Sequence, residues 1–301
     1  MTSNVGIWRH AVLQVVAFGR MVGFSHSISV LPFALAAVVL AKSTSSQPVS
    51  RTRVLWVTVA VLSCRSAALG FNRLADMHWD RLNPRTRNWA LPRGLISPRT
   101  VVFFVLLSAV VFFAAMGALS LACLYMSPIV LSVAFFHAFT KRFTWTSHFF
   151  LGVVYAMAPI VAWIAMRGDL RPSILVLGAV MAAWGAGFDI ICACQDHGFD
   201  REWRLYSIPQ TFGITKALWI SGALHGLSLL GMIALKWFFA LNVFYVLGVS
   251  LVGVFLLWGH IMAQPKATTN PRTAFFEASG LISVFYFVSV AGGTTPAALG
   301  G

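Results

Sequence analysis

Residues 101–119 read VVFFVLLSAVVFFAAMGAL, and residues 121–139 continue with LACLYMSPIVLSVAFFHAF. Neither run contains Asp, Glu, Lys or Arg. Each run is close to the roughly 20 helical residues that cross the hydrocarbon core of a bilayer. Runs of this length and polarity indicate two membrane-spanning helices that follow each other in the chain. The sequence therefore predicts an all-α membrane protein.

The composition extends this pattern over the whole chain of 301 residues. Hydrophobic residues make up 58% of the sequence and charged residues 10%, which is far from an ordinary soluble domain. We predict nine membrane-spanning helices. Their expected ranges are Phe24 to Ala41, Val54 to Phe71, Val101 to Leu119, Leu121 to Phe139, Ser147 to Met166, Ile174 to Ala193, Ala217 to Leu235, Phe239 to Ile261 and Phe275 to Gly292.

Short polar connectors separate these spans, so we expect a single membrane domain over residues 1–301. Residues 1–20 contain Trp8, Arg9 and His10 before an apolar patch and suit an interfacial helix. They lack the features of a cleaved secretory signal, so they are kept in the domain. Residues 293–301 are small and uncharged, which is typical of a loose tail.

The formal net charge of +14 does not indicate a nucleic-acid-binding protein, because the basic residues lie beside the spans rather than along one surface stripe. An N-terminus in the cytoplasm places most of them on the cytoplasmic side, as the positive-inside rule requires. We therefore expect a multi-pass protein of the inner (plasma) membrane. Lipid is its expected surrounding, and no protein partner can be inferred.

Only eight acidic residues occur in the chain, and six of them fall in two short stretches. The first stretch follows the second expected span, and the other follows the sixth. Four crossings separate the two, so both lie on the same face of the membrane, the cytoplasmic one, and can meet. Carboxylates at such positions usually have a function. The six are Asp76, Asp80, Asp189, Asp196, Asp200 and Glu202.

The spacing of the oxygen-bearing side chains suggests a metal-bound diphosphate. Asn72, Asp76 and Asp80 stand at i, i+4 and i+8, which places them on one face of a helix. Asp196 and Asp200 repeat this spacing, and Asp189 lies two turns earlier. Mg²⁺ prefers oxygen ligands and often joins carboxylates to a substrate phosphate. Two such ladders could therefore hold Mg²⁺ and a diphosphate together.

Basic residues near both ladders would bind phosphate oxygens through charge-assisted hydrogen bonds. The alternative is that carboxylates at helix ends are only solvated and that the arginines only set topology. Two matched ladders that hold most of the acidic residues favour the functional interpretation. The basic residues are Arg73, Arg81, Arg85, Arg87, Lys141, Arg142, Arg201 and Arg204.

Two motifs resemble those of a known family. The stretch Asn72-Arg73-Leu74-Ala75-Asp76-Met77-His78-Trp79-Asp80 is similar to the N-x-x-x-D-x-x-x-D motif of the UbiA superfamily of intramembrane aromatic prenyltransferases. The stretch Asp189 to Asp200 resembles the second aspartate motif of that family. The likeness extends over most of the chain between the first and the seventh span.

This resemblance implies a ring of nine helices around a central cavity that opens laterally to lipid. It implies Mg²⁺-dependent transfer of a polyprenyl group from a polyprenyl diphosphate to an aromatic acid. The metal ligands would be Asn72, Asp76, Asp80, Asp196 and Asp200. The catalytic aspartates would be the four aspartates among these ligands together with Asp189. Asp189 would have a supporting role or activate the acceptor. The expected substrate-binding residues are Arg65, Asn72, Arg73, Arg81, Lys141, Arg142 and Arg201.

The resemblance favours 4-hydroxybenzoate as the aromatic acceptor and leaves a dihydroxynaphthoate as the alternative. Arg65 is the one basic residue well inside a span, where it could bind the acceptor carboxylate, pair with an aspartate or cap a helix. In the ubiquinone branch of the family the acceptor would be 4-hydroxybenzoate. The run Asn83-Pro84-Arg85-Thr86 instead resembles a subgroup associated with menaquinone made by the futalosine route, where the acceptor would be a dihydroxynaphthoate.

Two departures from the family pattern stand near the motifs. Many relatives carry Asn-Arg-Pro-Leu-Pro where this chain has Asn88-Trp89-Ala90-Leu91-Pro92, so Arg87 or Arg93 would have to replace one basic contact. Cys192 stands where relatives commonly have Tyr. The scattered histidines are expected to be hydrogen-bonded inside the bundle rather than to act as bases: His26, His137, His148, His225 and His260.

A secondary transporter or cation channel is the rival class, since it would also keep charges inside a helical bundle. It predicts acidic residues nearer the middle of the spans, next to helices broken by Gly or Pro. Here most of the acidic residues lie at span ends and on one face, so the enzyme is favoured.

Overall fold

The computed structural model describes residues 13–19, 21, 30–45, 50–263 and 271–294, and within these ranges it contains helices and no strands. The expected all-α fold is confirmed. Residues 13–19 are helical, but the rest of the expected interfacial helix and most of the expected tail lie outside the described residues.

Seven candidate membrane helices of the described chain are long and apolar enough to cross a bilayer. Two shorter apolar segments lie at the ends, in α2 (Leu31–Ser43) and α13 (Pro271–Gly293). Each of the nine expected spans overlaps one of these helices within the described residues, although residues 24–29 of the first span lie outside them. The count of nine crossings stays a prediction. The seven helices are α3 (Arg51–Ala75), α5 (Pro98–Leu119), α6 (Leu121–Thr140), α7 (Ser147–Arg167), α8 (Pro172–Ala193), α11 (Ile214–Phe238) and α12 (Val243–Met262).

Local sequence signals set several of these helix ends. Ser97 caps the start of α5, because its side chain accepts a hydrogen bond from the Thr100 amide, and Pro98 occupies the first turn. Ser120 ends α5 and caps α6 by accepting from the Cys123 amide. Gly168 ends α7 in the left-handed conformation, with φ of 73°. The chain therefore reverses sharply between neighbouring spans.

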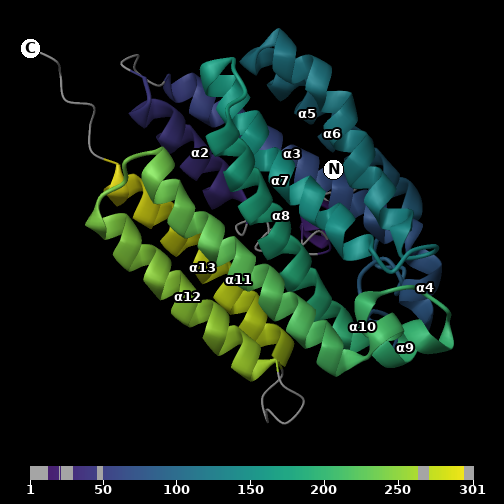
Figure 1. The fold of residues 1–301 in the computed structure, drawn as a ribbon. Helices are drawn as coiled ribbons and strands as arrows, with labels where there is room; N and C mark the ends of the chain where they lie inside the picture. The colour runs from purple at the N-terminus through teal and green to yellow at the C-terminus, as the bar shows by residue number, and fades with distance from the viewer. Residues whose placement is uncertain (1–12, 20, 22–29, 46–49, 264–270, 295–301) are drawn as a thin grey trace, which may run out of the picture.

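The nine helices pack as a closed ring in the described structure (Figure 1). Each helix from α2 through α3, α5, α6, α7, α8, α11 and α12 contacts the next, and α13 closes the ring against α2. Helix α2 also packs against α7, so it contacts a helix on the opposite part of the ring as well as its two neighbours. This arrangement agrees with the ring that the family resemblance implies.

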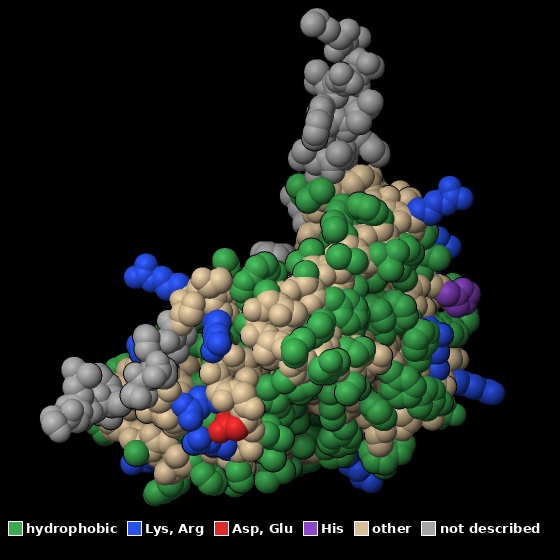
Figure 2. All heavy atoms as spheres, turned by 90° about the horizontal axis from the view of Figure 1, so that it is seen from above, with side chains coloured by type: hydrophobic (Ala, Val, Ile, Leu, Met, Phe, Trp, Pro, Cys, Tyr) green, Lys and Arg blue, Asp and Glu red, His purple; other side chains and the backbone are tan. Residues whose placement is uncertain are grey.

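The outer surface of the ring is apolar, as lipid contact requires. Helix α5 illustrates this, because Phe103, Leu106 and Val110 are each more than 60% exposed, whereas Val101 and Phe112 on its other side are buried. Figure 2 shows a broad area of hydrophobic side chains on one face of the molecule. A helix that is apolar on its exposed and its buried sides suits a membrane rather than water.

Four short helical segments gather at one end of the ring, and three of them carry Asp80, Asp196 and Asp200 (Figure 1). They are α4 (Met77–Leu82), η2 (Cys194–Asp196), α9 (His197–Glu202) and α10 (Ile208–Phe212).

The sequence predicts that each acidic motif lies on one helix, but in the structure each motif crosses a boundary between two helices. Helix α3 ends at Ala75, whose carbonyl oxygen accepts a hydrogen bond of 2.7 Å from Arg142. The Asp76 amide still bonds to the Asn72 carbonyl, and the Asp80 amide to the Asp76 carbonyl. Asn72, Asp76 and Asp80 therefore keep nearly the same helical face.

Glycine permits a close contact between the backbones of α7 and α8. A Cβ atom added at Gly152 in α7 would lie 2.5 Å from the carbonyl oxygen of Ala182 in α8. That oxygen belongs to the backbone and is not free to move aside. Small residues at such crossings allow membrane helices to pack tightly.

We therefore expect Gly152→Ala to lower the midpoint of thermal unfolding of the purified protein in detergent. Overpacking of this kind costs about 1–3 kcal/mol. Gly226→Ala in α11 is the matched control, since no heavy atom lies within 4 Å of its added Cβ. Tryptophan fluorescence during heating gives both midpoints, and equal midpoints for the two variants would contradict the close α7–α8 contact.

Candidate active site

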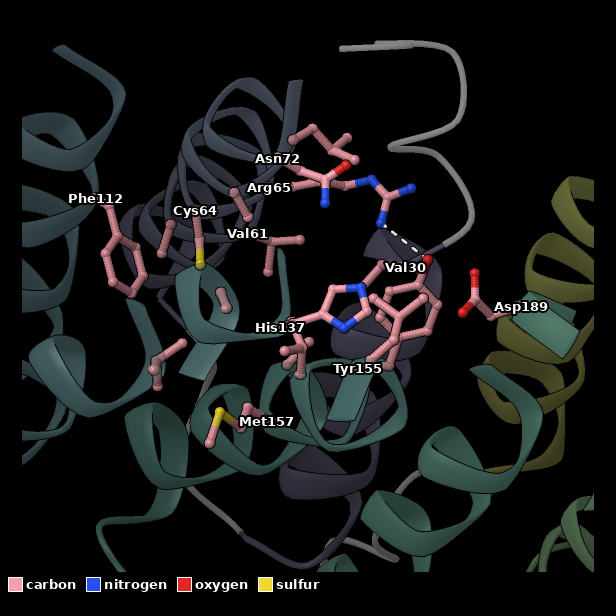
Figure 3. A pocket seen from close by; sticks show the side chains of 18 of the residues that line it. Val30, Val61, Cys64, Arg65, Asn72, Phe112, His137, Tyr155, Met157 and Asp189 are labelled. Carbon is pink, nitrogen blue, oxygen red and sulfur yellow. Dashed lines mark hydrogen bonds between the residues drawn. The ribbon is translucent and has the colours of Figure 1, made fainter. Parts of the chain in front are cut away.

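A cavity of about 1090 Å³ lies within the ring, bordered by α3, α5, α6, α7 and α8 (Figure 3). Apolar side chains from these helices form most of its wall, among them Val57, Phe112, Met116 and Val161. The polar residues of the wall come from widely separated parts of the chain. They are Arg65, Asn72, Arg73, Arg85, His137, Tyr155 and Asp189.

The first acidic motif is held by cations from the end of α6. Asp76 is only 1% exposed, and its Oδ2 atom lies 2.9 Å from Nζ of Lys141. Arg142 approaches the other oxygen, Oδ1, to 3.8 Å, and Oδ1 accepts no hydrogen bond. A buried carboxylate needs such partners, because an unpaired charge in this environment is costly.

Asp80 is paired within its own motif. Nη1 of Arg73 lies 3.1 Å from Oδ2 of Asp80, and Nη2 of the same arginine donates to Asn72 Oδ1 at 2.7 Å. Burial raises the pKa of Asp80 above its ordinary value, and the nearby Arg73 opposes the shift. A positive charge at this carboxylate therefore offsets part of the cost of its burial.

The second motif meets the segment that follows the first motif. Asp196 accepts two hydrogen bonds from Arg85, of 2.7 Å and 2.5 Å, and one of 3.0 Å from Asn83. Asp200 is 8% exposed and accepts a hydrogen bond of 3.0 Å from Ser207. The structure thus brings the two acidic stretches together at one end of the ring, as their topology predicts.

Trp89 stands between the two arginines that serve the separate motifs. Its ring centroid lies 4.4 Å from the guanidinium carbon of Arg73 and 5.4 Å from that of Arg85. Trp89 also lines the cavity. An aromatic face attracts cations at such distances, so this residue stabilises both arginines beside the cavity.

Arg65 and Asp189 border the cavity as well (Figure 3). Arg65 donates from Nη1 to the Tyr155 hydroxyl at 3.3 Å. Asp189 forms a hydrogen bond of 2.7 Å with Nδ1 of His148. Sequence reasoning expected His148 to be hydrogen-bonded but did not identify Asp189 as its partner, and it did not identify Tyr155 as the partner of Arg65. The pairs are separated by 41 and 90 residues, so no local spacing links them.

The structure shows where other residues singled out in the sequence lie. Arg81 and Arg201 are exposed and do not border the cavity, so their binding of substrate stays a prediction. His148, His225 and His260 are hydrogen-bonded inside the bundle, whereas Nδ1 of His137 is buried without a hydrogen bond. His26 lies outside the described residues.

The residues of the two motifs suit a hard divalent cation such as Mg²⁺, because their donors are carboxylate and amide oxygens. The buried Asp76 Oδ1, which accepts no hydrogen bond, is available for such an ion. In the described chain no three His, Cys, Asp or Glu side chains already form a metal-binding group. Arg73, Arg85 and Lys141 instead occupy the positions next to the carboxylates.

Known proteins resemble the chain in sequence. The sequence model of the UbiA prenyltransferase family matches residues 30–287. A 4-hydroxybenzoate octaprenyltransferase of Vibrio cholerae serotype O1 is 30% identical over 254 residues, which are 84% of this chain and 87% of the relative. An enzyme of the same name from Francisella tularensis subsp. novicida is 25% identical over 231 residues, which are 77% of this chain and 81% of the relative.

Solved structures share the fold. A UbiA homologue from Aeropyrum pernix K1 superposes with a TM-score of 0.77 at 27% identity, covering 89% of this chain and 96% of the homologue. A UbiA homologue from Archaeoglobus fulgidus, bound to GPP and Mg²⁺, gives a TM-score of 0.70 at 16% identity, covering 91% and 99%. Because the family match alone spans well over half of the sequence, the chain belongs to the UbiA prenyltransferase family.

Proposed function

We propose that this prenyltransferase transfers a polyprenyl group from a polyprenyl diphosphate to an aromatic acid, with 4-hydroxybenzoate as the acceptor. The observation that carries the proposal is one largely apolar cavity bordered by Asn72, Arg73 and Arg85 of the acidic-motif region and by Arg65 and Asp189. A diphosphate, an isoprenoid chain and a carboxylated ring would each find matching side chains there. The relatives named for 4-hydroxybenzoate support this choice of acceptor.

The diphosphate would bind where the two acidic motifs meet. Mg²⁺ would be held by Asn72, Asp76, Asp80, Asp196 and Asp200, the residues that the family resemblance implies. When bound, the metal supplies positive charge that stabilises the departing diphosphate. Arg73, Arg85, Lys141 and Arg142 already lie beside these carboxylates and can turn toward phosphate oxygens.

The aromatic acid would bind beside Arg65 and Asp189. Arg65 is held by Tyr155 at the cavity wall, where its guanidinium suits a carboxylate. Asp189 would accept a hydrogen bond from the ring hydroxyl, which increases the electron density of the ring. The bond between the prenyl carbon and the diphosphate oxygen breaks, the ring carbon ortho to the hydroxyl forms the new bond, and loss of its proton restores aromaticity. The apolar wall keeps water from the reacting allylic carbon.

The protein would lie in the inner membrane of the cell, and its active site would face the cytoplasm. Arg73, Arg85, Lys141 and Arg142 all lie at the end of the ring that carries the acidic motifs. The positive-inside rule assigns such an end to the cytoplasm.

We expect Asp76→Asn and Asp196→Asn each to lower turnover by at least about 100-fold, because losing a ligand removes several kcal/mol of charge stabilisation. The assay is release of pyrophosphate and the mass of the product in lipid nanodiscs, with 4-hydroxybenzoate and a dihydroxynaphthoate offered in parallel. Removing Mg²⁺ with EDTA should stop turnover, and added Mg²⁺ should restore it.

Asp169→Asn is the matched control for these variants. Asp169 pairs with Arg171 in the exposed connection between α7 and α8, so its loss should leave turnover unchanged. Unchanged turnover in both motif variants would contradict the diphosphate site. Failure of the wild-type protein to prenylate any aromatic acid would contradict the proposed function as a whole.

Arg65→Gln tests the acceptor site. We expect KM for 4-hydroxybenzoate to rise by about 10- to 100-fold, since a hydrogen bond to a charged group contributes about 1.5–3 kcal/mol. KM for the prenyl diphosphate should not change. With 4-hydroxybenzamide, which lacks the negative charge, wild type and variant should differ little. Arg53→Gln, at an exposed position on the same helix, is the control. An equal effect of Arg65→Gln on the acid and the amide would contradict carboxylate binding.

A further inference from the structure

His148 is a buried residue whose two ring nitrogens are both engaged. It lies near the start of α7 and is 2% exposed. Its Nε2 atom lies 3.2 Å from the backbone nitrogen of Ile208, which can only donate. Nε2 must therefore accept, and the proton of the neutral ring is on Nδ1. Nδ1 then donates to Oδ2 of Asp189 at 2.7 Å.

The Ile208 amide belongs to the segment that also holds a carboxylate of the second acidic motif. Ile208 is the first residue of α10, and Ser207 is its N-cap. The Ser207 hydroxyl accepts from the Gln210 amide at 3.2 Å and donates to Asp200 Oδ2 at 3.0 Å. A path of hydrogen bonds and one peptide unit thus joins Asp200 to Asp189 through Ser207 and His148.

Most residues of this path are shielded from solvent. Asp200, Ser207 and His148 are 8%, 3% and 2% exposed, respectively. Asp189 is the member that borders the cavity, and its side chain is 31% exposed. Hydrogen bonds in such surroundings meet little competition from water and hold their geometry well.

We propose that His148 is a positioning residue that orients Asp189 toward the aromatic acceptor and ties it to the segment that holds Asp200. The role rests on the proposed function, since it takes Asp189 as the group that meets the acceptor hydroxyl. With Oδ2 fixed by the Nδ1 proton, Oδ1 is left to accept from the substrate. His148 itself does not border the cavity and acts through Asp189.

Two variants separate the two hydrogen bonds of His148. In His148→Gln the side-chain amide can place its oxygen near the former Nε2 position, so Ile208 keeps its acceptor and Asp189 loses its donor. In His148→Asn the amide nitrogen can take the former Nδ1 position, so Asp189 keeps its donor and Ile208 loses its acceptor. A structural role predicts that both variants fail alike, and a positioning role predicts that they differ.

We expect His148→Gln to lower kcat by about 100-fold, the cost of a small misplacement of a reacting group. Its KM for the prenyl diphosphate, its Mg²⁺ dependence and its thermal midpoint should stay near those of the wild type. His148→Asn should recover most of the lost kcat while melting at a lower temperature. His225→Gln, which removes another buried histidine that bonds to His260, should leave kcat unchanged.

A double-variant cycle shows whether His148 acts through Asp189. If it does, His148→Gln should lower kcat no further when Asp189→Asn is already present. Independent, additive losses would overturn the proposal, and so would equal kcat values for the Gln and Asn variants. Wild-type turnover with an unaffected His148→Gln variant overturns this role alone. A wild-type protein that prenylates no aromatic acid overturns the proposed function and this role together.

Discussion

The site depends on the neutralisation of buried carboxylates at one end of an otherwise apolar ring. Asp76, Asp80 and Asp200 are nearly inaccessible, and an ionised carboxylate in such a place is stable only with a cation or strong donors beside it. Lys141 and Arg73 supply the cations for the first two, and Ser207 supplies a donor for the third. Removing one partner would leave a buried charge without compensation.

The same pairs hold together segments that the helical ring alone leaves apart. Lys141 and Arg142 join the end of α6 to the end of α3, and Arg85 joins the connection after α4 to η2. The Tyr206 amide adds a backbone hydrogen bond of 2.7 Å to the Lys141 carbonyl. These polar contacts therefore join the segments at the end of the ring that borders the cavity of about 1090 Å³, next to apolar contacts such as those of Leu91 and Ile208.

Much of this arrangement follows from the sequence, and the rest depends on contacts between distant residues. Runs such as residues 101–119 show α5 within a few residues, because span length and polarity are local properties. Topology likewise predicts that Asp76 and Asp196 lie at the same end. Local spacing does not show that Arg85 selects Asp196 or that His148 selects Asp189, because tertiary packing decides both pairs. The break of α3 at Asp76 is equally hidden, since it accompanies a bond from Arg142.

Trp89 links the electrostatics of the two motifs. Arg73 and Arg85 carry like charges near one ring, and each is balanced by a carboxylate of a different motif. A phosphate group that draws either arginine away would leave Asp80 or Asp196 without its cation, unless another cation arrives at the same time. If the proposed substrates bind here, a divalent ion on the carboxylates and a diphosphate on the arginines would together keep the buried charge balanced, whereas either alone would not. The proposed function therefore implies joint binding of metal and diphosphate, and the aromatic face of Trp89 would attract both arginines while their carboxylate partners change.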